Sequence, residues 1–209
     1  MDGVSPPRQA ISIPCMPVLV TRPSDAQLEV FRTSQCASDF SYAPAGMTRT
    51  GEAPSEYSVD HYRVRLGQGM QSFQRAQEAI GQWVMFDMGW TTVWRPRSPA
   101  EPGLTVAVLV RAFGLWWLNA CRVVYTFDDE LPVRRYGFAY GTLSEHAESG
   151  EERFAVEWDP ATDEVWYDLL AISRPNKLLV KTARPLARSL QRRFARDSQR
   201  AMVKFCEIV

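Results

Sequence analysis

Residues 104–127 have the sequence LTVAVLVRAFGLWWLNACRVVYTF, the longest largely apolar stretch of this 209-residue chain. A helix that spans a membrane needs about 20 consecutive apolar residues, and Arg111, Gly114, Asn119 and Arg122 interrupt this stretch. Its β-branched and aromatic residues favour strands instead. We therefore interpret it as two strands of a buried sheet, residues 104–113 and 115–127, joined by a tight turn at Gly114.

Further strands are expected on both sides of this stretch, because short segments of alternating or aromatic-rich sequence are separated by turn residues. The connections after residue 103 are short, and short connections join antiparallel neighbours. The additional predicted strands are residues 57–66, 134–143, 151–158 and 164–173.

Three helices are expected around these strands. Ser24 and Gln27 have capping-box spacing, which predicts a short helix that buries Leu28 and Phe31. Apolar residues at three- and four-residue steps predict a second helix from Met70 to near Met88. A third stripe predicts a long terminal helix, in which Pro185 should cause a kink or a fresh start. Its apolar members are Leu179, Ala183, Leu186, Leu190, Phe194, Ala201 and Phe205.

The element order is strand, helix, about five antiparallel strands and a long helix. Such an α+β chain can curl its sheet around the terminal helix and leave a cavity between them, as in the helix-grip fold of START domains and the birch-pollen allergen. We expect residues 1–20, which contain four prolines, to be a flexible arm. Residues 21–209 should form a single START-like domain with an N-terminal helical extension.

The composition narrows the possible partners. Lys and Arg number 24 and Asp and Glu number 24, so the formal net charge is zero. A nucleic-acid partner would require a basic surface, and none is expected. The four cysteines are widely spaced without a CxxC pair, which predicts free thiols, a cytoplasmic location and no bound metal or cofactor. We also expect a monomer.

Several motifs resemble uncharacterised protein family 0548. They are PSDAQLEVF at 23–31, FSYAPAG at 40–46, YGTLSEHAESGEERF at 140–154, VWYDLLAISRP at 165–175 and QRRFARDSQRAM at 191–202. The resemblance extends from about Arg22 to Met202. It implies kinship with the START-like superfamily, whose members bind sterols, lipids and plant hormones or act as polyketide cyclases. It implies a fold with an internal pocket, but fold likeness alone assigns no reaction.

Within the motif at 140–154, His146 lies among several glutamates. The group could be an acid–base site or only a polar hairpin turn. Glu152 is in phase with Phe154 and Val156, so its carboxylate should face inward, while Glu151 should face the other way, toward solvent. Arg174 could pair with a glutamate of this loop or stabilise negative charge on a substrate.

Aromatic and polar residues on the predicted strands are candidates for a ligand-binding wall. Isolated polar groups in an apolar wall orient ligands, although dense aromatic residues are also typical of an ordinary core. The candidate ligand-binding residues are Trp117, Asn119, Tyr125, Tyr140 and Tyr167.

Three functions remain open from the sequence. The first is a module that binds a small hydrophobic molecule, lipid-like or polyketide-like. The second is an enzyme of the cyclase, hydrolase or lyase kind, in which His146 or Glu152 moves a proton and Arg174 stabilises negative charge. The third is weak contact with an anionic membrane surface through a basic face of the terminal helix. That face consists of Lys181, Arg184, Arg188, Arg192 and Arg196.

Overall fold

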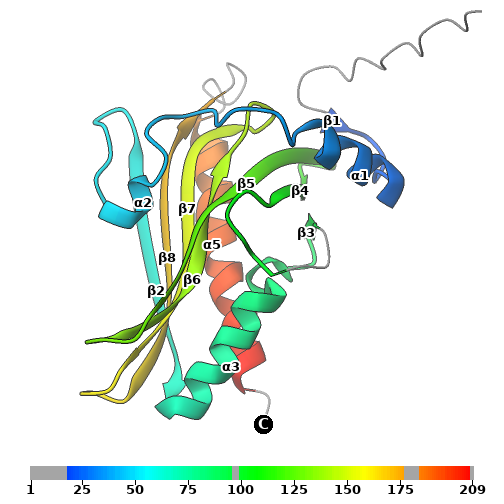
Figure 1. Cartoon of the computed structure of the whole chain (residues 1–209). Coiled ribbons are helices and arrows are strands. Elements are labelled where there is room, and N and C mark those ends of the chain that lie inside the picture. Colours follow the sequence, from blue (N-terminus) through cyan, green and yellow to red (C-terminus); the bar gives the residue numbers. More distant parts are fainter. Residues whose placement is uncertain (1–17, 96–98, 177–183, 208–209) are drawn as a thin grey trace, which may run out of the picture.

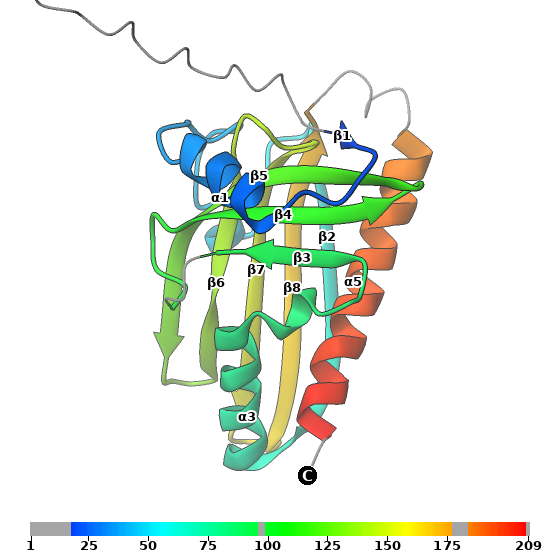
Figure 2. The same cartoon turned by 90° about the vertical axis from the view of Figure 1, so that its right-hand side faces the viewer.

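The computed structural model describes residues 18–95, 99–176 and 184–207, which form a bent antiparallel sheet with two long helices on its inner face (Figures 1 and 2). The helices are α1 (Asp25–Ser34), α2 (Met47–Thr50), α3 (Gly69–Gln82), the 3-10 helix η1 (Val84–Phe86) and α5 (Arg184–Glu207). The strands are β1 (Val18–Leu19), β2 (Ser58–Gln68), β3 (Thr91–Trp94), β4 (Thr105–Ala112), β5 (Leu115–Asp129), β6 (Arg134–Thr142), β7 (Glu148–Asp159) and β8 (Glu164–Pro175).

The sheet order in the described residues is β2-β8-β7-β6-β5-β4-β3, with β1 paired to β5, and every pair is antiparallel. In Figure 2, β2, β7 and β8 run upright beside α5, while β3, β4 and β5 cross above α3. The sheet thus bends around the helical layer. This arrangement is the helix-grip fold, and the fold predicted from the sequence is confirmed.

Rows of paired residues across the sheet determine how closely the helices pack on it. Tyr62, Leu169, Phe154 and Phe138 are successive partners across β2, β8, β7 and β6, so their side chains share one face. They form a close-packed core with α3, which buries residues at helical spacing. These residues of α3 are Phe73, Ala76, Ala79 and Ile80.

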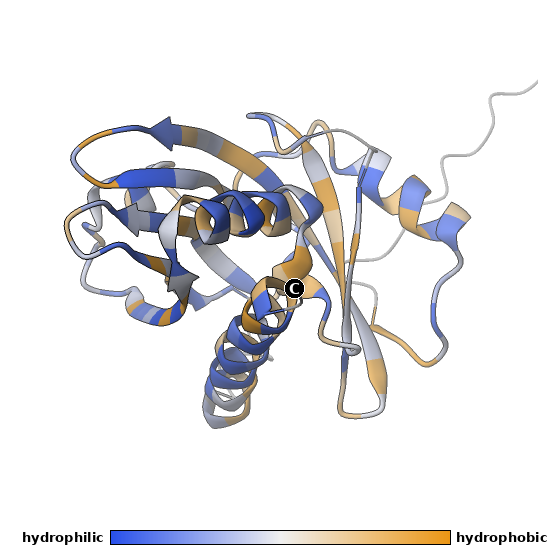
Figure 3. Ribbon diagram, turned by 90° about the horizontal axis from the view of Figure 1, so that it is seen from below, coloured by the Kyte–Doolittle hydropathy of each residue, from blue (hydrophilic) through white to orange (hydrophobic). Residues whose placement is uncertain are grey.

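Helix α5 completes this core with a narrow apolar stripe. Ala195, Met202 and Cys206 are buried at steps of seven and four residues, and the helix packs on β2, β8, η1 and α3. In Figure 3 its ribbon is mostly hydrophilic with scattered hydrophobic turns, as expected for an amphipathic helix. Pro185 is the second residue of α5, where its missing N–H costs no intrahelical hydrogen bond.

The outer face of the sheet is covered in part by the N-terminal segments. Leu28 and Phe31 of α1 pack on Leu109 and Leu118, and the predicted capping box of Ser24 and Gln27 is present. Residues near α2 pack on the outer face of β8. These contacts explain why β5 is apolar on both faces.

Glu151 holds the segment around α2 against the sheet. Its carboxylate accepts hydrogen bonds from the Tyr42 hydroxyl at 2.6 Å, the Gly46 N–H at 2.7 Å, the Thr48 N–H at 3.0 Å and the Thr48 hydroxyl. Its side chain is only 2% exposed. The prediction that Glu151 faces solvent was therefore wrong, because residues 42–48 fold over it and supply four donors.

A β-bulge in β5 corrects a second prediction. Val123 is the partner of Tyr140, but Tyr125 is the partner of Ala139, so Val124 is inserted between them. The insertion moves Tyr125 and Phe127 to the outer face, where the Tyr125 hydroxyl bonds to Thr48 at 2.8 Å. Simple alternation had placed Tyr125 on the same face as Trp117 and Asn119.

Other differences lie at the edges of elements. Val18 and Leu19 pair with Trp117 and Trp116, so the predicted arm ends in a short strand, and residues 1–17 lie outside the described residues. Strand β3 was not predicted. Helix α3 ends at Gln82 rather than near Met88. Residues 177–183, which include Leu179, Lys181 and Ala183 of the predicted helix, also lie outside the described residues.

The Tyr42 contact gives a direct test of how the outer segment is held. A Cβ added at Gly141 would lie 2.2 Å from the Tyr42 hydroxyl, whereas at Gly81 in α3 nothing lies within 4 Å. We expect Gly141→Ala to displace Tyr42 from Glu151 and lower the free energy of unfolding by about 2–4 kcal/mol. Gly81→Ala should raise it by up to about 1 kcal/mol. Denaturant unfolding measures both, and equal stability of the two variants would contradict this role of Gly141.

Candidate functional site

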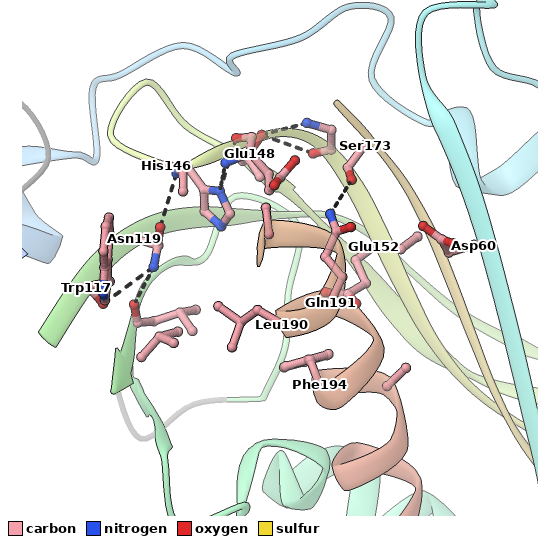
Figure 4. A pocket seen from close by; sticks show the side chains of 18 of the residues that line it. Asp60, Trp117, Asn119, His146, Glu148, Glu152, Ser173, Leu190, Gln191 and Phe194 are labelled. Carbon is pink, nitrogen blue, oxygen red and sulfur yellow. Dashed lines mark hydrogen bonds between the residues drawn. The ribbon is translucent and has the colours of Figure 1, made fainter. Parts of the chain in front are cut away.

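A cavity of about 480 Å³ lies between the inner face of the sheet and the first turns of α5. Figure 4 shows Leu190 and Phe194 of α5 facing it from below, with His146, Glu148 and Ser173 above. The apolar and aromatic lining residues include Tyr62, Trp90, Val108, Val110, Phe113, Trp117, Tyr140, Leu169, Leu186, Leu190 and Phe194.

The cavity exists because the inward side chains of the sheet become small toward this end. One row above the bulky core, Asp60, Ala171, Glu152 and Tyr140 are successive partners across β2, β8, β7 and β6. In the next row, Ser173 pairs with Gly150. Ala171 and Gly150 bring little or no side chain into the space below α5, so this space stays partly unfilled there.

Two exposed apolar side chains mark the opening of the cavity. Phe113, at the turn between β4 and β5, is 58% exposed, and Leu186, in the first turn of α5, is 49% exposed. Both line the cavity. A molecule entering between them would meet an apolar rim before it reaches the polar end.

The polar end contains two carboxyl groups from β7. Glu152 accepts a hydrogen bond from the Tyr140 hydroxyl at 2.8 Å, and its predicted inward direction is confirmed. Burial raises the pKa of Glu152 to about 7, against the effect of the Tyr140 hydrogen bond. Burial also raises the pKa of Glu148 to about 7, and its buried Oε2 has no hydrogen-bond partner in the described residues.

His146 lines the cavity but is held by backbone rather than by a carboxylate. Its Nδ1 lies 2.9 Å from the Glu148 amide nitrogen and 3.0 Å from the Glu148 carbonyl oxygen. Burial lowers the pKa of His146 to about 4, so the ring is neutral at pH 7. In the described structure no glutamate side chain forms a hydrogen bond with this ring.

Asn119 connects the wall of the cavity to the loop of His146. Its Oδ1 accepts the Ala147 N–H at 3.2 Å, and its Nδ2 donates to the Val108 carbonyl at 3.4 Å. Figure 4 shows these bonds on the side of the cavity where Trp117 lies. Asn119 therefore positions the 144–147 loop, and its polar atoms are already engaged.

An ion pair joins α5 to the edge of the sheet beside the cavity. The Arg188 guanidinium bonds both carboxylate oxygens of Asp60, at 2.5 and 2.8 Å. Gln191, one turn along, donates to the Ser173 hydroxyl at 3.2 Å. These contacts fix the distance between helix and sheet at the level of Glu152.

Three predicted site residues lie elsewhere. Arg174 lies on the outer face, where it contacts Glu56 at 3.3 Å and stacks on Tyr57, because the alternation along β8 turns it away from Ser173. Tyr125 is on the outer face because of the bulge. Tyr167 is on the inner face but within the core, where its hydroxyl bonds to Ser198 at 2.8 Å. None of the three lines the cavity.

Five of the predicted site residues line the cavity: Trp117, Asn119, Tyr140, His146 and Glu152. The lining also includes Asp60, Glu148 and Gln191, which were not among the predicted site residues. Glu148 shares the phase of Glu152, and β7 begins three residues earlier than predicted. The alternation along β7 could therefore have indicated that Glu148 faces inward. Asp60 comes opposite Glu152 only through the register of β2 and β8, which a single sequence does not reveal.

The basic face predicted on the terminal helix is only partly directed to solvent. Arg188 turns toward Asp60, while Arg192 is exposed and Arg196 contacts Asp197 of its own helix. Contact with a membrane surface stays a prediction. No helix in the described ranges is long and apolar enough to cross a membrane.

A family model described as a domain of unknown function, DUF1990, matches residues 41–201. A UPF0548 protein of Dictyostelium discoideum is 32% identical over 200 residues, covering 88% of this chain and 93% of its own. A UPF0548 protein of Deinococcus radiodurans is 37% identical over 199 residues, covering 89% and 97%. The chain belongs to the UPF0548 family. The family predicted from the sequence motifs is thereby confirmed.

Solved structures similar to this UPF0548 chain are distant. Ara h 8.0201 superposes with a TM-score of 0.44 at 8% identity, over 71% of this chain and 99% of its own. Human STARD10 gives a TM-score of 0.43 at 10% identity, over 89% and 80%. The ZhuI aromatase/cyclase gives 0.44 at 15% identity, over 72% and 94%. The helix-grip assignment rests on the strand order and terminal helix of this chain itself.

The raised pKa of Glu152 predicts how stability varies with pH. The folded state retains the proton between pH 4.5 and about 7, so the free energy of unfolding falls as pH rises through this window. Glu152→Gln, which cannot ionise, should be more stable than the wild type at pH 8 by on the order of 2 kcal/mol, with little difference at pH 5.

Denaturant unfolding at the two pH values measures this difference. Glu157→Gln is the matched control, because Glu157 lies on the outer side of β7 and pairs with Arg63 at 2.7 Å and Arg135 at 3.4 Å. Glu157→Gln should lower the free energy of unfolding at pH 8, because it removes these two ion pairs. A Glu152→Gln variant that is also less stable at pH 8 would show that Glu152 is ionised without cost.

Proposed function

We propose that this protein binds a small hydrophobic molecule in the cavity under α5. One observation carries the proposal: an apolar cavity of about 480 Å³ lies between the sheet and α5, beside the buried core. Binding cavities for small molecules have volumes of roughly 300–1,000 Å³ and apolar walls with a few polar groups. An unfilled cavity of this kind lowers stability, and a bound apolar molecule restores the missing contacts.

The arrangement of the walls supports an elongated or flat apolar ligand with one polar end. Trp90, Trp117 and Phe194 offer aromatic surface along the walls, while Tyr140 and Glu152 present hydrogen-bonding groups at one end. The ligand would enter past Phe113 and Leu186. Free thiols at the described Cys36, Cys121 and Cys206 also support the proposed cytoplasmic location.

A second candidate function is acid–base catalysis in the same cavity. It is favoured by Glu152, whose pKa of about 7 lets it give and take a proton near neutral pH while Tyr140 orients it. Arg174 has no part in this version, since it lies on the outer face. Catalysis predicts that Glu152→Gln binds a substrate but does not convert it. Full turnover by this variant would exclude Glu152 as the acid or base.

Filling the cavity tests the binding function. Ala187 lines the cavity from α5, whereas Ser189, two residues away, is exposed and does not line it. We expect Ala187→Phe to occupy the space and weaken binding of N-phenyl-1-naphthylamine, a neutral dye that fluoresces in apolar surroundings, by about tenfold or more. Its Tm should stay at or above the wild-type value.

Ser189→Phe adds the same ring on the other side of the helix and should bind the dye as the wild type does. Fluorescence titration and thermal unfolding of the three proteins are sufficient. Unchanged dye affinity in a folded Ala187→Phe variant would contradict binding in this cavity.

A further inference from the structure

The charges that face the cavity are unbalanced. Its described lining includes four acidic residues and neither Lys nor Arg. The Glu151 carboxylate bonds to the outer segment, and the Asp60 carboxylate is matched by Arg188. Glu148 and Glu152 are the two carboxyl groups left, and neither makes an ion pair with a described residue.

The geometry of β7 places these two groups around one space. They are four residues apart on the same face, and Gly150 between them carries no side chain. Glu152 accepts one hydrogen bond from Tyr140, and Oε2 of Glu148 is buried with no partner in the described structure. A buried carboxylate without a cation is unfavourable, and among the described residues the one cation beside this end of the cavity is Arg188, which is already bonded to Asp60.

We propose that the ligand is a hydrophobic amine whose protonated nitrogen lies at the polar end of the cavity, beside Glu148 and Glu152. This inference rests on the proposed binding function and specifies its ligand class. The ammonium group supplies the missing charge and donates to the unpartnered Oε2 of Glu148. Its apolar body extends along Trp117, Leu190 and Phe194 toward the rim.

The other charge classes fit less well. A ligand carboxylate or phosphate would be repelled by two acids, and the nearby Arg188 is already bonded to Asp60. A neutral alcohol can hydrogen-bond to a carboxyl group but leaves the charge unmatched.

The proposal fits the proton affinity of the site. Burial raises the pKa of both Glu148 and Glu152 to about 7, so the free protein partly neutralises them with protons. The other titratable or charged groups around them are Asp60 and Tyr62 of β2, Cys121 of β5, Tyr140 of β6, Tyr167 of β8, Arg188 of α5 and the neutral His146. Protons therefore compete with an ammonium group below pH 7, and amine affinity should fall as pH decreases from 8 to 6.

The test is isothermal titration of the full-length protein with octylamine, octan-1-ol and octanoate, which share one apolar chain. At pH 8 the amine should bind about 10- to 100-fold more tightly than the alcohol, with octanoate weakest. At pH 6 the amine affinity should drop by about tenfold or more, while the alcohol affinity stays constant.

The double variant Glu148→Gln/Glu152→Gln removes both charges with little change of shape. It should bind octylamine no better than octan-1-ol and lose the pH dependence. The matched control is Glu157→Gln, which removes a charge from the outer side of the same strand and should keep the preference for the amine.

The outcomes separate the two proposals. If the wild type binds amine and alcohol equally, or if the double variant keeps the preference for the amine, the ligand class is wrong and the binding function stands. If octanoate binds most tightly of the three, the ligand class is likewise wrong and the binding function stands. If the wild type binds none of the three, both the ligand class and the proposed function fail.

Discussion

The size of the inward side chains along β7 and β8 determines how α5 lies on the sheet. Phe154 faces the helical layer and is buried in the core, whereas Leu169, its partner on β8, lies where the core meets the cavity. Ala171 and Ser173 lie two and four residues after Leu169 on β8, and they leave a gap between the sheet and α5. The helix cannot fill this gap, because its C-terminal turns are already packed on the core through Ala195, Met202 and Cys206. The cavity therefore results from the small side chains at these positions of β8.

Polar contacts keep this gap from collapsing. Arg188 binds Asp60 of β2 with two hydrogen bonds, and Gln191 binds Ser173 of β8, so the N-terminal part of α5 is tied to these two strands. On the other side of the sheet, Glu151 holds the α2 segment behind the same strands. The neighbours Glu151 and Glu152 thus perform opposite tasks. One is satisfied by four donors, and the other is left with a raised pKa in an apolar space.

Much of the fold could be predicted from local patterns. The capping box of α1, the strands from β4 to β8 and the inward phase of Glu152 all follow from spacing alone. Tyr125 could not be placed, because nothing in the alternation reveals that Val124 is a bulge. Glu151 was misplaced because its donors come from a segment about 105 residues away, which has no periodic pattern. Arg174 was assigned to the site by charge, although the phase of β8 turns it outward.

The candidate site depends even more on register. Asp60, Ala171, Glu152 and Tyr140 become neighbours only when four strands align, so the sequence could indicate single members but not the row. The absence of a basic residue from the described lining also emerges only in three dimensions. Sequence patterns predicted the fold and the inward direction of Glu152, whereas the polar end of the cavity is defined by strand pairing across the sheet.

The central claim is that the space under α5 holds a small molecule. The most direct measurement is native mass spectrometry of the freshly isolated protein, before and after incubation with a lipophilic extract of the same cells. The account predicts one discrete added mass at 1:1 stoichiometry that disappears on denaturation and releases an identifiable compound. The mass of the bare chain both before and after incubation would contradict it.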